Sequence, residues 1–322
     1  MKVVQFCPDD CPTSGVNTFA SELNAALVRA GVDSRLVRTT DKLDSADVVH
    51  IHGLWLKPMH QAFVWAKKNG LPVVWSTHGM TAPWAMKHKW WKKLPAWLLY
   101  QRKDLRGADL IHATTELERS WNGPLRQVVV PLGTHLPEAE PPAGGGATRT
   151  LLFVGRIHPV KAIDRIIAAF QRAPHAGWRL RIVGPDEVGY RKELEKIAGP
   201  DVDFVGSRLG ADLAREYAAC DCAILASHTE NFGATIVDAL AHGKPVIAGT
   251  RTPWQVVAET GCGWGGENDV GTLAKAIGEM VALTDEGRAE MGARGRKLVE
   301  EKYTWSAVAK TMAKAYAEVC RG

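Results

Sequence analysis

Short apolar strands alternate with amphipathic helices in two long series, and this alternation limits the fold more than any other feature of the chain. In the first series, apolar side chains recur at helical spacing from Phe19 to Ala30, and Gly31 ends that helix. Strands are expected there at residues 2–6, 36–37, 47–51, 72–75, 110–113 and 128–130. Because strands joined by helices form parallel sheets covered on both faces, the pattern predicts an α/β protein.

A second series begins at Thr150, and a length of 322 residues allows two domains. Strands are expected at residues 151–154, 180–183, 202–205, 222–226 and 245–248, and helices at 163–170, 190–198, 213–219, 234–242 and from 270 to the end. Between the series, residues 134–149 are rich in proline and glycine, which is typical of a linker. We therefore expect a first domain over residues 1–133 and a second from residue 150. Each is a doubly wound parallel sheet with its ligands at the carboxyl ends of the strands, and the two face a central cleft.

Composition excludes several classes of protein. Hydrophobic residues make up 46% and charged residues 23%, as in ordinary globular proteins and unlike disordered or collagen-like chains. No apolar run approaches the ~20 residues that span a bilayer, and the N-terminal segment lacks the apolar stretch of a signal peptide. A cytoplasmic location is the expectation. Six cysteines are too few for a disulfide scaffold. Cys7, Cys11, Cys220 and Cys222 lack partners for a zinc site and are interpreted as reduced core thiols.

The segment from Ser227 to Ala248 carries the strongest chemical signal. A strand ends before it, Glu230 lies in the loop, and a helix begins near Gly233. Asp238 follows Glu230 by eight residues, ~12 Å along a helix axis, so both carboxylates can face one cleft. The backbone N–H groups between them lie at a helix N-terminus, which favours anions such as phosphate. The alternative is a capping acid and a solvent-facing Asp.

Two cations follow the first strand of the second series. Arg156 and Lys161 lie in the connecting loop before the next helix. Because charge-assisted hydrogen bonds to phosphate are strong, this placement suits a diphosphate. Taken singly, each residue is also consistent with an ordinary solvated charge.

Two further strand ends in the first domain are candidate sites. Gly15 opens the first helix and permits close approach of a ligand to the backbone, with Thr13 or Ser14 as the expected cap. His78 follows the strand at residues 72–75 and precedes Gly79, which suits a cleft ligand or a structural histidine. Neither the G-x-G-x-x-G fingerprint of dinucleotide-binding proteins nor a G-x-x-x-x-G-K-[ST] phosphate loop is present.

Taken together, these segments resemble the retaining glycosyltransferases of family 4, which have the GT-B fold. ENFGATIVDALAHGKPVIA is similar to that family's E-x-F-G-x(4)-E helix and the G-x-P-V-I strand after it, and GRIHPVKAIDRII to its phosphate segment. SGVNTFASELNAAL is similar to its N-terminal glycine loop, and STHG to its donor-sugar histidine. The stretch that begins HGMTAPWAMKHKWWKK also resembles members that build bacterial lipopolysaccharide or exopolysaccharide.

The resemblance implies transfer of a sugar from a nucleotide diphosphate donor to a saccharide acceptor, with retention and without a metal or cofactor. Arg156 and Lys161 would hold the diphosphate, and Glu230 would bind hydroxyls of the donor sugar. The leaving phosphate would take the acceptor's proton. His78 would contact the donor sugar near the reacting carbon. The backbone N–H groups of Asn231, Phe232 and Gly233 would contact sugar or phosphate. Gly15 would let the first helix approach the phosphates or the acceptor.

One residue departs from the family pattern. The second acid of the motif is usually Glu and is Asp238 here, one methylene shorter, so its implied contact with ribose would shift or use a water. The resemblance also divides the second half into a nucleotide-sugar-binding domain, residues 150–302, and a C-terminal helix, residues 303–322, that crosses back to the first domain.

Other residues in the chain have metal-like spacing. His50 and His52 share one face of a strand but lack a third ligand at a recognisable spacing, so His52 and Trp55 are interpreted as lining the acceptor cleft or as ordinary packing. Asp201 and Asp203 resemble the D-x-D motif of a different, metal-dependent glycosyltransferase fold, but they open a predicted strand. A plain structural role is therefore expected for both aspartates.

The net charge of +5 comes from one segment. From Pro83 to Arg106 there are seven Lys and Arg against one Asp, interleaved with Trp84, Trp90, Trp91 and Trp97. Cations and tryptophans together suit an anionic membrane surface or a lipid-linked acceptor, and the alternative is a solvated helix with a partly buried aromatic face. No nucleic-acid motif accompanies the segment. We therefore expect no nucleic-acid partner and a peripheral position on the inner membrane face.

Alternatives remain open at this stage. A sugar-nucleotide epimerase of the same fold would need catalytic acids that the sequence does not place, and a Rossmann oxidoreductase would need the missing glycine fingerprint. An inactive scaffold that only binds the nucleotide sugar is a further possibility. UDP is favoured over GDP as the donor's nucleotide. The sequence does not determine the sugar, the acceptor and linkage, the oligomeric state, or whether Asp238 fully replaces Glu.

Overall fold

The structure is a computed structural model that describes residues 1–11, 14–137 and 148–321. The chain divides into two units, Met1–Gly133 with Lys302–Gly322 (unit 1) and Thr134–Glu301 (unit 2). Residues 138–147, which form most of the predicted linker, and the predicted cap Thr13 lie outside the described residues.

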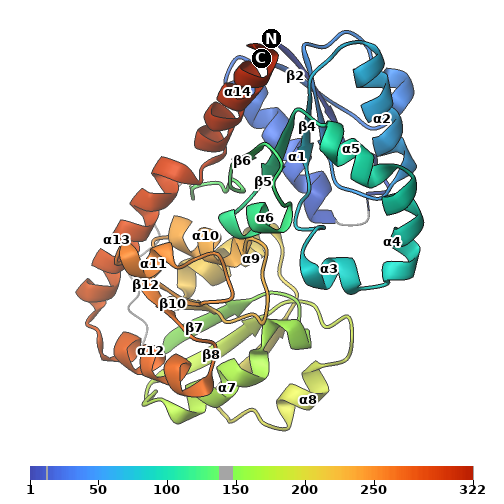
Figure 1. Cartoon of the computed structure of the whole chain (residues 1–322). Helices are drawn as coiled ribbons and strands as arrows, with labels where there is room; N and C mark the ends of the chain where they lie inside the picture. Colours follow the sequence, from blue (N-terminus) through green and yellow to red (C-terminus); the bar gives the residue numbers. More distant parts are fainter. Residues whose placement is uncertain (12–13, 138–147, 322) are drawn as a thin grey trace. The chain divides into compact units, whose positions relative to one another are not determined.

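Unit 1 is built on a six-stranded parallel sheet in the order β2-β1-β3-β4-β5-β6 (Figure 1). Its strands are β1 Lys2–Phe6, β2 Asp33–Val37, β3 Val48–His52, β4 Val73–Ser76, β5 Leu110–Ala113 and β6 Gln127–Val129. Its helices are α1 Ser14–Arg29, η1 Thr40–Lys42, α2 Lys57–Lys68, α3 Pro83–Lys87, α4 Trp90–Ala96, η2 Trp97–Gln101, α5 Arg102–Gly107, α6 Glu116–Trp121 and α14 Trp305–Arg321. The strand order reverses between β1 and β3, and a reversal of this kind marks the ligand-binding edge of a doubly wound sheet.

The C-terminal helix α14 is part of unit 1 and lies beside α1 (Figure 1). Its apolar face joins the core of α1, where Met312 and Tyr316 pack with Phe19 and Leu23. Trp305, at the start of α14, lies so close to Gly133 that a Cβ there would be 2.3 Å from its ring. The last helix is therefore fixed to the unit by burial of its apolar face.

Unit 2 carries a second six-stranded parallel sheet in the order β12-β11-β10-β7-β8-β9. Its strands are β7 Arg149–Val154, β8 Trp178–Val183, β9 Val202–Gly206, β10 Cys222–Leu225, β11 Val246–Gly249 and β12 Gly263–Gly266. Its helices are η3 Pro159–Lys161, α7 Ile163–Arg172, α8 Arg191–Glu195, α9 Gly210–Ala219, α10 Ala234–Ala241, α11 Val256–Glu259, α12 Val270–Ala282 and α13 Asp285–Lys302. The order reverses between β7 and β10, as in dinucleotide-binding folds.

The predicted α/β class and parallel sheets are confirmed, and the differences have local causes. Strand β12 was not predicted because GWGG has three glycines and no apolar pattern. Helix α2 was also not predicted. The segment from Pro83 to Gly107 is not one helix, because His88 is extended and Lys89 has a left-handed φ of 48°. From Trp90 to Gly107, α4, η2 and α5 follow one another directly. The helical sequence predicted from Val270 onward forms α12, α13 and α14, and α14 corresponds to the expected C-terminal helix.

None of the helices in the described part of the chain is both long enough and apolar enough to cross a bilayer. All six cysteines lie in the described residues; they are thiols rather than disulfides, and only Cys320 is exposed.

Candidate functional site

The loops that follow β7 and β10 meet at the point of unit 2 where the strand order reverses. The backbone N–H of His228, after β10, donates to the carbonyl of Val160, after β7, at 2.8 Å. The two loops that were predicted separately from the sequence are therefore fixed to each other. A doubly wound sheet offers its ligand site at this position.

Lys161 and Glu230 are brought together by these loops. Lys161 Nζ lies 2.5 Å from Glu230 Oε2, and each side chain is only 16% exposed. Ser227 Oγ donates to the same carboxylate oxygen at 3.3 Å. A half-buried ammonium and carboxylate in contact provide one donor for an anion and one acceptor for hydroxyl groups, which are the two functions needed to bind a sugar phosphate.

Arg156 lies in the same loop as Lys161 but apart from the ion pair. Its side chain is 58% exposed, and its guanidinium is 3.7 Å from the carboxylate of Glu187. The loop depends on Gly184 at the end of β8, because a Cβ there would lie 1.9 Å from the carbonyl oxygen of Gly155. Arg156 is thus an accessible cation on a tightly packed loop.

The N-terminus of α10 lies directly after Glu230. Gly233 caps the helix with a left-handed φ of 78°, and a Cβ there would meet Leu225 at 2.8 Å, so glycine suits the position on both counts. Phe232 is buried against Trp254, whose indole N–H donates to the Phe232 carbonyl at 2.5 Å. This packing holds the chain at Asn231–Gly233 in place, where backbone N–H groups at a helix N-terminus favour an anion.

Asp238 lies on the second turn of α10, and its carboxylate accepts a hydrogen bond from Thr134 Oγ1 at 2.7 Å. Burial raises the pKa of Asp238 to about 6, although the Thr134 hydrogen bond and the charge of His135 oppose the shift. Asp238 is therefore an acceptor whose charge changes near neutral pH.

His78 and His52 are brought together in unit 1. His78 follows β4 with a left-handed φ of 50°, and its Nε2 lies 3.3 Å from Nδ1 of His52 at the end of β3. Burial lowers the pKa of His78 to about 4; Glu118 opposes the shift and His112 adds to it. The imidazole of His78 is therefore neutral at physiological pH and can offer a hydrogen bond but no charge.

Glu118, which was not predicted from the sequence as a site residue, holds the turn that carries His78. Its carboxylate accepts from Thr77 Oγ1 at 2.6 Å and from the N–H of Gly79 at 2.5 Å, the residues on either side of His78. Burial raises the pKa of Glu118, but hydrogen bonds from Thr114, Thr77 and Gly79 outweigh burial and keep the pKa below its ordinary value. The one sequence pattern that includes Glu118 is the capping pattern T-x-x-E that begins at Thr115, which predicts the start of a helix there.

A buried polar chain continues from this turn into the core of unit 1. Ser76 Oγ contacts both His50 Nε2 at 2.6 Å and His112 Nδ1 at 2.5 Å, and His50 Nδ1 contacts the hydroxyl of Tyr316 on α14 at 2.6 Å. His50 is thus a structural core residue linked to the C-terminal helix. Among the residues described, no three His, Cys, Asp or Glu side chains are grouped so that they could hold a metal.

The other predicted residues lie apart from these groups. Trp55 has a left-handed φ of 82° and is held by its backbone, which donates to Gln101 Oε1 at 2.8 Å and accepts from Tyr100 Oη at 2.6 Å. Gly15 is exposed at the start of α1, with open space where a Cβ would lie. Asp203 forms a two-point ion pair with Arg179 at 2.6 and 2.7 Å, in line with the structural role expected for this acid.

Comparison with known proteins identifies the family. Residues 34–133 match the model "Glycosyl transferase 4-like domain", and residues 148–282 match "Glycosyl transferases group 1". The two matches together cover more than half of the chain. The chain belongs to the group 1 and family 4-like glycosyltransferases, as the sequence motifs predicted.

Curated relatives support the same family. The chain is 29% identical to a D-inositol 3-phosphate glycosyltransferase of Kineococcus radiotolerans, over 84% of this chain and 71% of the relative. It is 28% identical to a glycogen synthase of Mycobacterium tuberculosis, over 92% and 74% of the two chains. The two relatives are named for different products or acceptors, inositol phosphate in one and glycogen in the other.

Solved structures show the fold. Anabaena HepE in complex with UDP-glucose matches with a TM-score of 0.71 at 16% identity, over 99% of this chain and all of that chain. WaaG, a glycosyltransferase involved in lipopolysaccharide biosynthesis, matches with a TM-score of 0.67 at 16% identity, over 99% and 100%. The chain has the GT-B fold of these glycosyltransferases.

Proposed function

We propose that this glycosyltransferase moves a sugar from a UDP-sugar to a saccharide of bacterial cell-surface polysaccharide or lipopolysaccharide, with retention at the anomeric carbon. The observation that carries the proposal is the Lys161–Glu230 pair at the strand-order reversal of unit 2, beside the N-terminus of α10. A structural neighbour has been solved with UDP-glucose, which favours UDP as the nucleotide.

In the proposed reaction the bond from the anomeric carbon to the donor phosphate breaks and a bond from that carbon to the acceptor oxygen forms. The acceptor's proton passes to the leaving diphosphate on the same face of the sugar. Negative charge grows on the diphosphate, and Lys161, Arg156 and the α10 N–H groups stabilise it. Such preorganised positive potential is commonly the largest contribution of an enzyme to catalysis.

Glu230 is proposed to accept hydrogen bonds from the sugar hydroxyls once the donor phosphate has taken over Lys161. The backbone of Asn231, Phe232 and Gly233 is proposed to contact sugar or phosphate, with Gly15 near phosphate or acceptor. His78 is proposed to contact the reacting sugar as a neutral imidazole, and Trp55 to lie on the acceptor side. The predicted acceptor-side residue His52 is fully buried, and we propose that it positions His78 instead. No metal or cofactor takes part in this scheme.

Asp238 gives the site a pH dependence if it binds ribose. A carboxylate accepts hydrogen bonds at both oxygens only when it is ionised, so affinity for UDP-glucose should rise as the pH increases through about 6. If only the ionised form binds, affinity at pH 5 is about tenfold lower than at pH 7. Calorimetric titration across this range should show the rise in the wild type and a flat profile in Asp238→Asn. UDP-glucose suits the experiment because its diphosphate has no terminal phosphate to titrate.

The donor is tested by a thermal-shift panel of UDP-, GDP- and ADP-sugars. We expect a UDP-sugar to raise the midpoint most, because only ligands that bind the folded state stabilise it. Stabilisation by GDP- or ADP-sugars alone would overturn UDP as the donor nucleotide. Analysis of the sugar product then separates a transferase from an epimerase, since an epimerase would return a changed nucleotide sugar without consuming acceptor.

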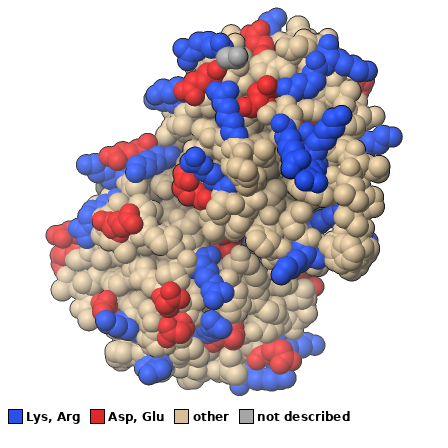
Figure 2. Space-filling model, viewed as in Figure 1, with Lys and Arg blue, Asp and Glu red and all other residues tan. Residues whose placement is uncertain are grey.

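The segment from Pro83 to Arg106 is proposed to hold the enzyme at an anionic membrane surface. Six of its large apolar side chains are exposed, and they are Trp84, Trp90, Trp91, Leu94, Leu98 and Leu99. Lys and Arg side chains gather on the same part of unit 1, over α5 (Figure 2). Exposed tryptophans among cations suit the interface of an anionic bilayer, where each added cation is worth about 1 kcal/mol.

Liposome sedimentation tests this surface. We expect the enzyme to pellet with vesicles that contain anionic lipid and to be released by salt, because the attraction is partly electrostatic. Replacing Trp90 and Trp91 by serine should weaken pelleting, and replacing Trp264 of unit 2 by serine is the matched control. Equal pelleting of all three proteins, or none with anionic vesicles, would contradict the membrane proposal.

A further inference from the structure

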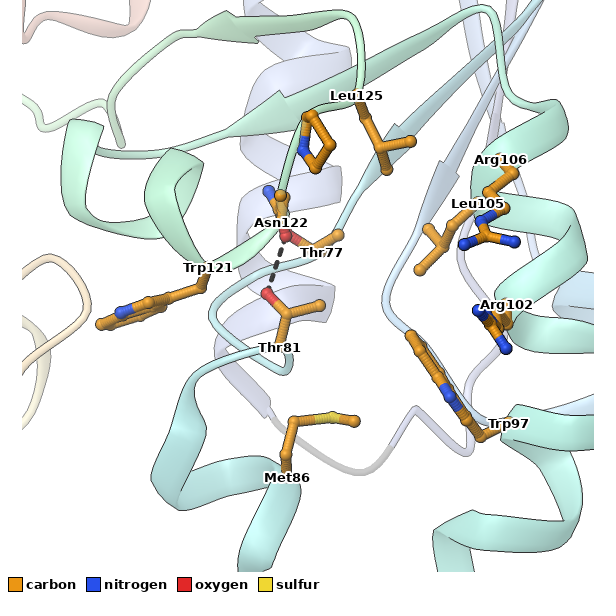
Figure 3. A pocket seen from close by; sticks show the side chains of 12 residues that line it. Thr77, Thr81, Met86, Trp97, Arg102, Leu105, Arg106, Trp121, Asn122 and Leu125 are labelled. Carbon is orange, nitrogen blue, oxygen red and sulfur yellow. Dashed lines mark hydrogen bonds between the residues drawn. The ribbon is translucent and has the colours of Figure 1, made fainter.

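Unit 1 contains a pocket that belongs neither to the Lys161–Glu230 site nor to the histidine cluster. Its volume is about 370 Å³, and it lies between the α3–α5 segment on one side and the end of α6 on the other (Figure 3). Its wall is formed by Thr77, Thr81, Met86, Trp97, Arg102, Leu105, Arg106, Trp121, Asn122, Gly123, Pro124 and Leu125.

The pocket is a built feature rather than a loose gap. Thr81 Oγ1 donates to Asn122 Oδ1 at 2.7 Å and thereby ties the loop after β4 to the end of α6 (Figure 3). Trp97 and Leu105 pack against the core of the unit, so one wall is anchored. Most of the lining side chains are apolar, which suits an apolar portion of a ligand.

Two cations stand at this apolar wall. Arg102 and Arg106 are four residues apart on α5, one helical turn, and both are exposed. Neither guanidinium group has an ion-pair or hydrogen-bond partner within residues 1–11, 14–137 and 148–321. Asp104 lies between them in sequence but is 2% exposed and paired with His60 at 2.8 Å. Two unpaired guanidinium groups beside an apolar wall match an anionic group such as phosphate.

The pocket also adjoins the turn that carries His78. Thr77 lines the pocket, precedes His78 in sequence and is held by Glu118. A ligand in the pocket would therefore contact the turn that positions His78, whose imidazole faces His52. The exposed apolar side chains of α4 and η2 continue from Trp97 along the same segment.

We infer that this pocket binds the acceptor, and that the acceptor carries a phosphate attached to an apolar chain. Arg102 and Arg106 hold the phosphate, and Trp97, Trp121 and Met86 contact the adjoining apolar part. The inference rests on the proposed glycosyl transfer and adds to it the class of acceptor. Two guanidinium groups and an apolar wall together fit a lipid phosphate better than either a neutral saccharide or free phosphate.

The test uses calorimetric titration of the full chain with farnesyl phosphate, farnesol and inorganic phosphate as probes. We expect farnesyl phosphate to bind at least tenfold more tightly than the other two. The double variant Arg102→Gln/Arg106→Gln should weaken farnesyl phosphate binding at least tenfold, and Trp121→Ala should weaken it without changing the charge. The matched control is Arg119→Gln/Arg126→Gln, two exposed cations of unit 1 that neither line the pocket nor lie in the segment from Pro83 to Arg106.

UDP binding is measured on the same samples. It shows whether each variant is folded, and it distinguishes a failure of this inference from a failure of the proposed function. Normal UDP binding with lost farnesyl phosphate binding in the pocket variants supports the inference. Unchanged farnesyl phosphate binding in those variants overturns it, as does inorganic phosphate binding as tightly as farnesyl phosphate, which would indicate a plain anion site. Absence of UDP binding in the wild type would instead overturn the proposed function.

Discussion

Replacing Lys161 by alanine is expected to lower donor turnover by about 10²–10³-fold, the cost of removing one preorganised donor from a site of growing negative charge. The effect should fall mainly on kcat, because the charge on the diphosphate is larger in the transition state than in the bound donor. Release of UDP from UDP-glucose, followed with and without acceptor, measures it. Glu230→Ala should lower turnover as well, through loss of a sugar contact.

A matched control is available in the same unit. Lys196 pairs with Glu193 at 3.3 Å and is 69% exposed, so Lys196→Ala removes an ion pair of the same kind away from the site. Exposed pairs contribute about 0–1 kcal/mol, and this variant should keep wild-type turnover. Near-normal rates in both Lys161→Ala and Glu230→Ala would contradict the assignment of the donor site.

Acidification is expected to destabilise unit 1 strongly. Burial, together with the nearby charges of other histidines, holds the pKa values of His50 and His52 well below the usual range, and the pKa of His78 is about 4. The unfolded chain takes up protons at these histidines near pH 6.5, whereas the folded chain does not, so stability falls as the pH drops below about 6.5. Below this pH, each histidine lowers the free energy of unfolding by about 1.4 kcal/mol per pH unit, and the three together lower it by about 4 kcal/mol per pH unit.

Hydrogen exchange measured by peptide between pH 7 and pH 5 reports this effect separately for each unit. Protection of β3, β4 and β5, corrected for the intrinsic rate, should fall steeply below pH 6. His50→Gln should lower the slope by about one histidine's share, and His88→Gln, at an exposed position, should leave it unchanged. Protection in β3–β5 that is independent of pH over this range would contradict the expected role of the buried cluster.

The sequence predicted the sheets well because parallel strands buried on both faces are short continuous apolar runs, as at Leu110–Ala113. It was less successful where structure depends on tertiary contacts. The glycines of β12 form a strand through pairing with β11, and the left-handed backbone at Lys89 separates α3 from α4. Local pattern does not encode either feature.

In the candidate site, too, the positions of residues along the chain could be predicted and their tertiary contacts could not. Arg156, Lys161 and Glu230 could be predicted because strand ends and helix starts can be read along the chain. The partners of the two cations could not be predicted, because they depend on how the two loops pack. Lys161 contacts Glu230, whereas Arg156 faces Glu187. Glu118 and Ser76 were missed because their importance lies in partners that are distant in sequence.

The stereochemistry of the released sugar tests the central claim most directly. Hydrolysis of UDP-α-glucose, or of whichever UDP-sugar the panel favours, can be followed by proton NMR before mutarotation equalises the anomers. Retention predicts that the α-anomer is released first. The donor-site assignment predicts that Lys161→Ala slows this release about 10²–10³-fold while Lys196→Ala leaves it unchanged. Release of the β-anomer first, or equal release by both variants, would contradict a retaining transferase with its donor site at Lys161 and Glu230.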